Sequence, residues 1–235
     1  MTETTSRLVV VVPAAGVGKR MQANCPKQYL EINNKAVIEH TVERLLSHQA
    51  IDHIIIALSE EDGYFGDLAI ANNPRVKTVK GGKERVDSVL AGLKSIDVDM
   101  FPWALVHDAA RPCLSLVDLN NLIEFCLHMG EGGILAYPVK DTMKRTRSSG
   151  LIEHTVEREN LWHALTPQMY KTSELITAIE SGLQNKVEIT DESSAIEANG
   201  LPSHVVAASP NNIKITQPED LAFAEFILAQ QSENK

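Results

Sequence analysis

A glycine-containing turn near the N-terminus has the residue types that bind phosphate. Residues 13–20 read PAAGVGKR and directly follow an apolar run at 7–12. Gly16 and Gly18 would let backbone N–H groups approach phosphate oxygens closely. A P-loop also needs a glycine five residues before Gly18 and a hydroxyl side chain two residues after it, and a dinucleotide fingerprint needs a third glycine three residues after it. This chain has neither pattern, so the turn alone fits a phosphate site and a plain tight turn equally well.

Two cations flank this turn and favour the phosphate interpretation. Arg20 ends the segment, and Lys27 follows Pro26, which fixes the backbone conformation just before it. Nucleotidyl transfer builds negative charge on non-bridging phosphate oxygens, and fixed cations stabilise that charge. Arg20 and Lys27 are therefore predicted to clamp a triphosphate from two sides.

The elements that must position these residues alternate between strand and helix patterns. Continuous apolar runs predict buried strands at 7–12, 53–58, 76–79, 103–106, 134–139 and 204–207. Apolar residues at helical spacing and capping signals predict helices at 36–47, from Ser59, after Gly81-Gly82, at 115–128, 171–182 and 191–199, and after a capping box at 216–219. This alternation predicts an α/β fold with a Rossmann-like open, mostly parallel sheet and helices on both faces. Ligands bind such sheets at the carboxyl ends of the strands, where the glycine turn and Asp108 lie.

The alternation is interrupted at residues 139–160. This segment is polar, has a turn at Ser148-Ser149-Gly150, and alternates in polarity after that turn. The pattern predicts a β-hairpin arm that projects from the sheet. No internal repeat is present, so the 235 residues are interpreted as one domain that includes this arm.

Composition and charge narrow the function classes. The net charge of −9 argues against nucleic-acid and anionic-membrane partners. Lysines and arginines nevertheless cluster near positions 20, 84 and 144, which suggests small phosphorylated ligands, although solvated surface charge is an alternative. No apolar run is long enough to span a membrane, the first seven residues do not resemble a signal peptide, and three scattered cysteines indicate no disulfide or zinc framework. A cytoplasmic location is predicted.

The order of motifs resembles one enzyme family. The turn followed by Pro26-Lys27 is similar to nucleotidyltransferases that join a nucleoside triphosphate to a sugar or polyol phosphate. Later motifs narrow the resemblance to 2-C-methyl-D-erythritol 4-phosphate cytidylyltransferases: VHDAARP at 106–112, DTMK at 141–144, LTPQ at 165–168, TDE at 190–192 and NIK at 212–214. It covers about residues 8–228.

This resemblance implies a reaction and its cofactor. CMP would pass from CTP to 2-C-methyl-D-erythritol 4-phosphate by direct attack of the substrate phosphate on the CTP α-phosphorus, with release of pyrophosphate, in isoprenoid precursor biosynthesis. A divalent cation such as Mg²⁺ would be held mainly by the triphosphate, and no protein ligand for it is assigned.

The resemblance also implies residue roles. Arg20 and Lys27 would stabilise the transition state, and Arg158 and Lys214 would hold the attacking phosphate. CTP would be bound by Pro13, Ala14, Ala15, Gly16, Gly18, Lys19, Gly81, Gly82, Ser88, Asp108 and Ala109. The polyol phosphate would be bound by Asp108, Arg111, Thr142, Arg158, Thr166, Thr190 and Lys214. Two positions depart from the family pattern: Lys19 replaces an arginine, and Lys83 stands where an acid is frequent.

Several of these residues also have simpler interpretations. Asp108 also fits a cap for the turn after its strand, Arg111 a surface ion pair, and Thr190 a helix N-cap, a role compatible with phosphate binding. In the family, the hairpin arm crosses to a second subunit. The resemblance therefore implies a homodimer in which the arm at 139–160 brings Arg158 or Thr142 to the partner's site.

Three other functions remain open at this point. A cytidylyltransferase for ribitol phosphate or another polyol phosphate would share the nucleotide-binding residues. A nicotinamide-dependent oxidoreductase would need the third glycine, and Met21 stands in its place. A non-catalytic nucleotide sensor of the same fold would bind nucleotide without releasing pyrophosphate.

Overall fold

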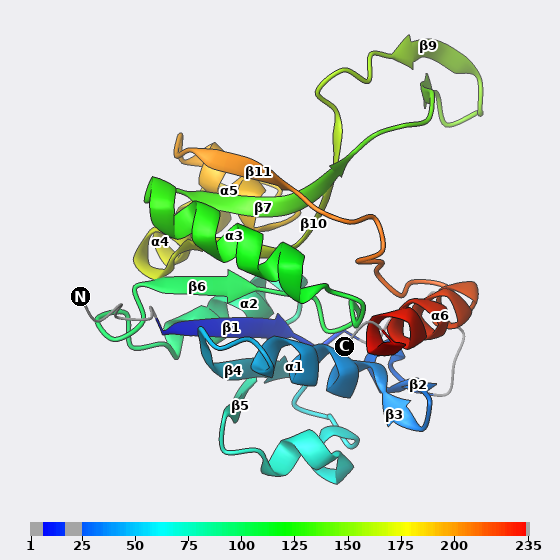
Figure 1. The fold of residues 1–235 in the computed structure, drawn as a ribbon. Coiled ribbons are helices and arrows are strands. Elements are labelled where there is room, and N and C mark those ends of the chain that lie inside the picture. The colour runs from blue at the N-terminus through cyan, green and yellow to red at the C-terminus, as the bar shows by residue number, and fades with distance from the viewer. Residues whose placement is uncertain (1–6, 17–24, 234–235) are drawn as a thin grey trace.

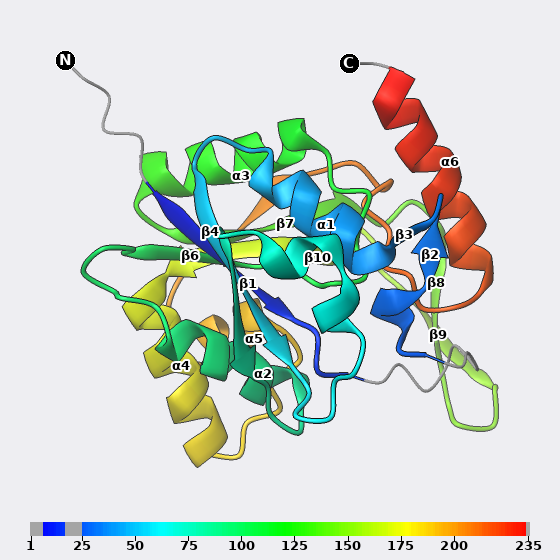
Figure 2. The same ribbon diagram turned by 90° about the horizontal axis from the view of Figure 1, so that it is seen from below.

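The centre of the molecule is a seven-stranded sheet with the strand order β11-β7-β10-β6-β1-β4-β5 (Figures 1 and 2). The computed structural model describes residues 7–16 and 25–233. The strands are β1 (Leu8–Pro13), β4 (Ile51–Leu58), β5 (Val76–Lys80), β6 (Trp103–Val106), β7 (Gly132–Pro138), β10 (Trp162–Lys171) and β11 (Ser203–Ala207). β10 pairs antiparallel with both β6 and β7, and the other pairings are parallel. The predicted Rossmann-like, mostly parallel sheet is confirmed.

Helices cover both faces of the sheet, and the alternation of side chains along β1 explains why (Figure 2). Leu8, Val10 and Val12 belong to one apolar cluster with α1 (Val37–Leu46) and α3 (Leu116–Met129). Val9 and Val11 point the other way, into a cluster with α2 (Arg85–Lys94), α4 (Thr172–Gln184) and α5 (Glu192–Ala198). A strand buried on both faces is what a continuous run of valines predicts.

One predicted element is wrong, and one strand was not predicted. The helix predicted from Ser59 is absent: residues 59–64 form turns, and two short 3₁₀ helices follow, η3 (Phe65–Asp67) and η4 (Ala69–Asn72). The acid of Asp62 there caps the backbone N–H groups of Tyr64 and Phe65 instead of starting an α-helix. Strand β10 was not predicted, because Pro167 and the polar residues around it hide a strand that pairs with β6 and β7.

The last helix, α6 (Glu219–Glu233), lies beside the sheet and packs on a small apolar cluster of its own. The carboxylate of Asp220 accepts hydrogen bonds from the backbone N–H groups of Thr216 and Gln217. The predicted capping box is therefore shifted by one residue from Glu219. No helix in the described ranges is long and apolar enough to cross a membrane.

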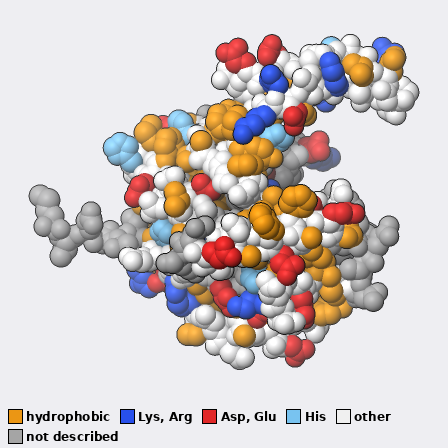
Figure 3. Space-filling model, turned by 45° about the vertical axis from the view of Figure 1, so that its right-hand side comes forward, with side chains coloured by type: hydrophobic (Ala, Val, Ile, Leu, Met, Phe, Trp, Pro, Cys, Tyr) orange, Lys and Arg blue, Asp and Glu red, His pale blue; other side chains and the backbone are white. Residues whose placement is uncertain are grey.

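Residues 139–160 leave the body of the molecule as a hairpin (Figure 1). β8 (Met143–Thr146) and β9 (Ile152–Val156) pair antiparallel in a separate two-stranded sheet. Nearly every side chain of this hairpin is exposed. In space-filling view it stands clear of the body and carries both cationic and acidic groups (Figure 3). A second two-stranded sheet, β2 (Glu31–Ile32) with β3 (Lys35–Ala36), precedes α1.

Candidate active site

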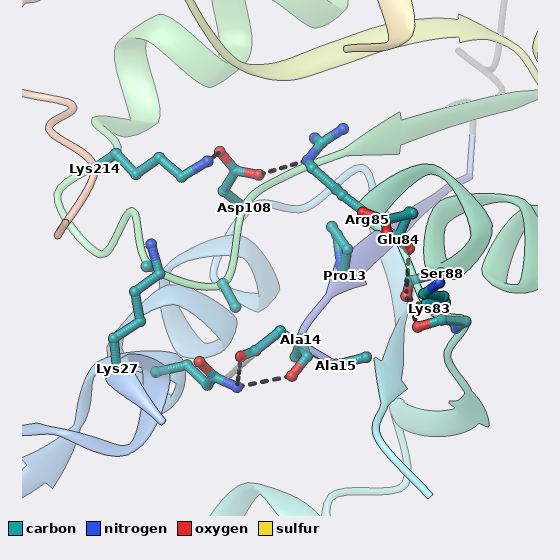
Figure 4. A pocket seen from close by; sticks show the side chains of 15 residues that line it. Pro13, Ala14, Ala15, Lys27, Lys83, Glu84, Arg85, Ser88, Asp108 and Lys214 are labelled. Carbon is teal, nitrogen blue, oxygen red and sulfur yellow. Dashed lines mark hydrogen bonds and ion pairs between the residues drawn. The ribbon is translucent and has the colours of Figure 1, made fainter. Parts of the chain in front are cut away.

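A cavity of about 190 Å³ opens at the carboxyl ends of β1 and β6 (Figure 4). Ten of the predicted site residues line it: Pro13, Ala14, Ala15, Gly16, Lys27, Gly82, Ser88, Asp108, Ala109 and Lys214. Gln28, Lys83, Glu84, Arg85 and Ala110 complete the described lining. Four cations in this lining face two carboxylates, so this part of the cavity suits an anionic ligand.

The end of β1 forms one wall, and a buried amide fixes its shape. The Ala14 N–H donates to the carbonyl of Ala57 on β4 at 2.8 Å. The Gln28 amide donates to the carbonyls of Ala14 and Gly16 at 2.7 and 3.1 Å. Gln28 is 4% exposed and was not among the predicted site residues, although it follows Lys27 directly. Gln28 thereby fixes residues 14–16 at the edge of the cavity. Gly18, Lys19 and Arg20 lie outside the described residues.

The turn between β5 and α2 forms an adjoining part of the cavity wall. The Ser88 hydroxyl accepts from the Gly82 N–H at 3.1 Å and donates to the Glu84 carbonyl at 3.3 Å. A Cβ on Gly82 would lie 2.2 Å from that of Asp87, and one on Gly81 would lie 2.7 Å from that of Ala15. Both positions therefore require glycine for steric reasons. The segment predicted to bind CTP through Gly81, Gly82 and Ser88 is a tightly packed turn, of which Gly82 and Ser88 line the cavity.

Asp108 lies between Arg85 and Lys214, two residues after the end of β6 (Figure 4). Arg85 Nε donates to one carboxylate oxygen at 3.1 Å, and Lys214 Nζ reaches the other at 2.8 Å. Arg111 Nε lies 3.4 Å from that second oxygen. Burial by itself would raise the pKa of Asp108, but the charges of Arg85, Lys214 and Arg111 outweigh it and hold the pKa well below its usual range. Asp108 is therefore a permanent anion here.

Arg85 is held from its other side by Glu192, the first residue of α5. Its two terminal nitrogens donate to the two Glu192 oxygens at 2.6 and 3.2 Å. Burial raises the pKa of Glu192, and the facing Arg85 opposes this rise. Neither residue was predicted, although Arg85 lies in a cationic cluster and Glu192 in the TDE motif. This bidentate pair links the turn before α2 to the segment that contains Thr190.

Behind Asp108, Arg111 and Thr166 are buried and connect neighbouring loops. Arg111 donates to the carbonyl of Asn212 at 2.7 Å. It is therefore a buried residue that links two loops and not part of a surface ion pair. Asn212 in turn donates to the carbonyl of Thr166 at 2.7 Å. The Oδ1 atom of Asn212 is buried with no hydrogen-bond partner among the described residues. Such an acceptor calls for a donor from a water or a ligand hydroxyl.

Lys27 and Lys214 reach the cavity from segments far apart in sequence. Lys27 begins the short 3₁₀ helix η2 (Lys27–Tyr29), and its ammonium group donates to the carbonyl of Ile215 at 2.9 Å. Lys214 precedes that residue and extends to Asp108. One hydrogen bond thus links the segment after the glycine turn to the segment that carries Lys214, which places two predicted catalytic cations around one cavity.

Six described residues of the predicted site do not line the cavity. Gly81, Arg111 and Thr166 pack against residues that line it. The other three are Thr142, Arg158 and Thr190. Thr142 and Arg158 are exposed on the arm, and the Arg158 guanidinium donates to the carbonyl of Lys140. Thr190 is also exposed. The N-cap of α5 is Asp191, whose carboxylate accepts from the Ser194 N–H at 3.0 Å, so the predicted N-cap role of Thr190 is wrong.

The described residues include few candidate ligands for a metal ion. No group of three or more histidine, cysteine or acidic side chains lies close together within 7–16 and 25–233. Asp108 faces the cavity but is already compensated by three cations. The donor set of this part of the chain fits a metal that is carried by phosphate oxygens and not by a protein cage.

Comparisons with known proteins agree with this geometry. Residues 8–230 match the model of the IspD family, 2-C-methyl-D-erythritol 4-phosphate cytidylyltransferase. The 2-C-methyl-D-erythritol 4-phosphate cytidylyltransferase of Colwellia psychrerythraea is 58% identical and that of Vibrio parahaemolyticus 54% identical, with at least 98% of each chain covered. A crystal structure of the Francisella tularensis protein of the same name superposes with a TM-score of 0.82 at 32% identity, covering 94% of this chain and 100% of the other.

Proposed function

This chain belongs to the 2-C-methyl-D-erythritol 4-phosphate cytidylyltransferase family, and we propose that the cavity over β1 and β6 is where its two substrates meet. The reaction transfers CMP from CTP to 2-C-methyl-D-erythritol 4-phosphate and releases pyrophosphate, a step of isoprenoid precursor biosynthesis. The proposal rests on the ion pairs of Asp108 with Arg85 and Lys214, which lie in the cavity that residues 13–16 of the glycine turn also line.

CTP would lie between the end of β1 and the turn before α2. The backbone of residues 13–16 would face the phosphates and ribose, and the Gly81-Gly82 turn with Ser88 would face the base. The Ser88 hydroxyl is already hydrogen-bonded to Gly82 and Glu84 within that turn. Base recognition would therefore depend mainly on the backbone groups of the turn. A close backbone turn admits a pyrimidine edge and excludes a purine by size.

The chemical step needs no side-chain nucleophile and no general base, because a phosphate oxygen of the acceptor is already ionised at pH 7. In-line attack on the α-phosphorus forms one P–O bond and breaks another, and pyrophosphate leaves with the electron pair. Lys27 would neutralise the charge that builds on the α-phosphate, together with Arg20. Lys214 would bind the acceptor phosphate, and its partner Asp108 would then be able to accept hydrogen bonds from ribose or polyol hydroxyls.

A divalent cation, Mg²⁺ in our proposal, would be held mainly by the triphosphate. Bound there, it would neutralise phosphate charge and help pyrophosphate to leave. The absence of a carboxylate cluster among the described residues is compatible with this arrangement. Asp108 is the described side chain best placed to approach such an ion.

The hairpin arm is proposed to act across a homodimer. Met143, Leu151 and Ile152 expose apolar surface on it, and a two-stranded hairpin without a core of its own is marginal in water. Thr142 and Arg158 would enter the acceptor site of a second copy. Three free cysteines support a reducing compartment, so we propose a cytoplasmic location.

Pyrophosphate release tests the proposal directly. The purified protein would be assayed with CTP, ATP, GTP or UTP, each with and without 2-C-methyl-D-erythritol 4-phosphate. Release is expected only when CTP and the acceptor are both present. Ribitol phosphate replaces the acceptor in a parallel series: release with it alone would assign the protein to that substrate. Binding of NAD(P), or CTP binding without turnover, would support the oxidoreductase or the sensor instead.

A further inference from the structure

His107 is a fully buried titratable group that the proposed reaction does not use. It follows the last residue of β6 and precedes Asp108. Its Nε2 atom lies 3.1 Å from the carbonyl oxygen of Arg111, and its Nδ1 atom lies 3.0 Å from the hydroxyl of Thr166. The same hydroxyl lies 3.1 Å from the backbone nitrogen of Asp108. These three contacts form one continuous run of hydrogen bonds from Arg111 through His107 and Thr166 to Asp108.

A neutral His107 ring allows only one distribution of protons over these three contacts. The Arg111 carbonyl can only accept, so the single ring proton must lie on Nε2, which donates to it. The Asp108 N–H can only donate, so the Thr166 oxygen accepts from it. Nδ1 of the neutral ring can only accept, so the Thr166 hydroxyl donates its proton to Nδ1. Burial lowers the pKa of His107 to about 4, in agreement with a neutral ring.

The run is anchored to the segment that carries Lys214. The Thr166 carbonyl accepts from the Asn212 amide, and the Asn212 carbonyl accepts from Arg111. His107 therefore belongs to a set of hydrogen bonds that links the loop of Asp108 and Arg111 to Thr166 and Asn212. Lys214 follows Asn212 by two residues. Because the Thr166 hydroxyl donates its proton to His107 Nδ1, any ligand group that hydrogen-bonds to this hydroxyl must be the donor.

We propose that His107, as a neutral ring protonated on Nε2, is the positioning residue that orients Asp108, Arg111 and Thr166 toward the polyol-phosphate acceptor. The role of these groups toward the acceptor rests on the proposed function, whereas the proton arrangement does not. His107 touches no substrate in this account and acts only through the loop it holds.

Ring nitrogen resonances test the proton arrangement independently of activity. Long-range ¹H–¹⁵N spectra of the ¹⁵N-labelled protein at pH 7 would contain one neutral, Nε2-protonated ring whose signals disappear in His107→Asn. A ring protonated on Nδ1, or on both nitrogens, would overturn the proposal. Because this measurement needs no substrate, it holds even if the wild-type protein shows no pyrophosphate release, an outcome that would instead count against the proposed function.

Steady-state kinetics test the positioning role. His107→Asn keeps a group near Nδ1 but loses the donor to Arg111, and kcat/KM for the acceptor is expected to fall about tenfold or more, since small displacements of binding groups cost this much. His53→Asn is the matched control, because His53 is also buried but lies near the start of β4, away from the cavity. It is expected to keep wild-type kinetics.

A double variant separates positioning from general destabilisation. Thr166→Val breaks the same run, so His107→Asn with Thr166→Val is expected to lose little more activity than the worse single variant. All assays are run well below each variant's unfolding temperature, with folding checked by circular dichroism. A folded His107→Asn protein with wild-type kcat and KM, or two losses that multiply, would overturn the proposal.

Discussion

Lys27 is the described cation that we expect to contribute most to the chemical step. Lys27→Ala should lower kcat/KM for pyrophosphate release about 100- to 1000-fold, the effect of removing one preorganised group that stabilises transition-state charge. Lys35→Ala is the control, because Lys35 pairs with Glu43 on the surface beside α1. Wild-type rates in a folded Lys27→Ala protein would contradict the assignment. The same measurement on Arg20→Ala tests the second cation.

His107 also makes a prediction about stability and pH. Its pKa is lowered from 6.5 to about 4 in the folded protein, so between these values the unfolded chain binds more protons. The stabilisation is present above pH 6.5 and is lost as the pH falls toward 4, by about 3 kcal/mol in total. Urea unfolding of the wild-type protein and of His107→Phe from pH 7 to 4.5 measures it. The wild-type free energy of unfolding should fall more steeply; parallel curves would contradict the prediction.

The Gly81-Gly82 turn before α2 lies in the proposed CTP site, so a change in its packing should affect nucleotide binding. Gly82→Ala would bring a new Cβ to within 2.2 Å of Asp87, so the turn must shift. We expect CTP affinity, measured by calorimetry, to fall about tenfold, because the backbone groups that face the base move with the turn. Gly63→Ala is the matched control, since a Cβ there meets no atom within 4 Å. Equal CTP affinity in both variants would exclude this turn from the CTP site.

Most elements were predictable because their apolar periodicity is local. The valine run of β1 and the spacing of Ile38, Val42 and Leu45 in α1 determine both the element and its buried face. β10 was not predictable in this way, since its place depends on pairing with β6 and β7. In the site, Asp108 follows from its position after a strand. Its partner Arg85 and the Glu192 beyond it are separated by 107 residues, and no local pattern indicates that they meet.

In the proposed homodimer, the arm of one chain would complete the acceptor site of the other. Arg158 is exposed on the projecting arm, whereas Lys214 lines the cavity in the body. Arg158→Ala and Lys214→Ala are each expected to be inactive dimers. A hybrid dimer of one chain of each kind, isolated with two different tags, has one site with both residues intact if the arm crosses to the partner. It should regain about half of the wild-type activity per dimer.

The same hybrid separates a crossing arm from an arm that serves its own chain. If Arg158 acted within its own subunit, both sites of the hybrid would carry one defect, and activity would stay at the level of the single variants. Sedimentation of the wild-type protein is the companion measurement: a fully active monomer would contradict the crossing arm outright. Recovery to about half of the wild-type activity, together with a dimeric wild-type protein, would mean that the arm with Thr142 and Arg158 completes the site in the body of the other chain.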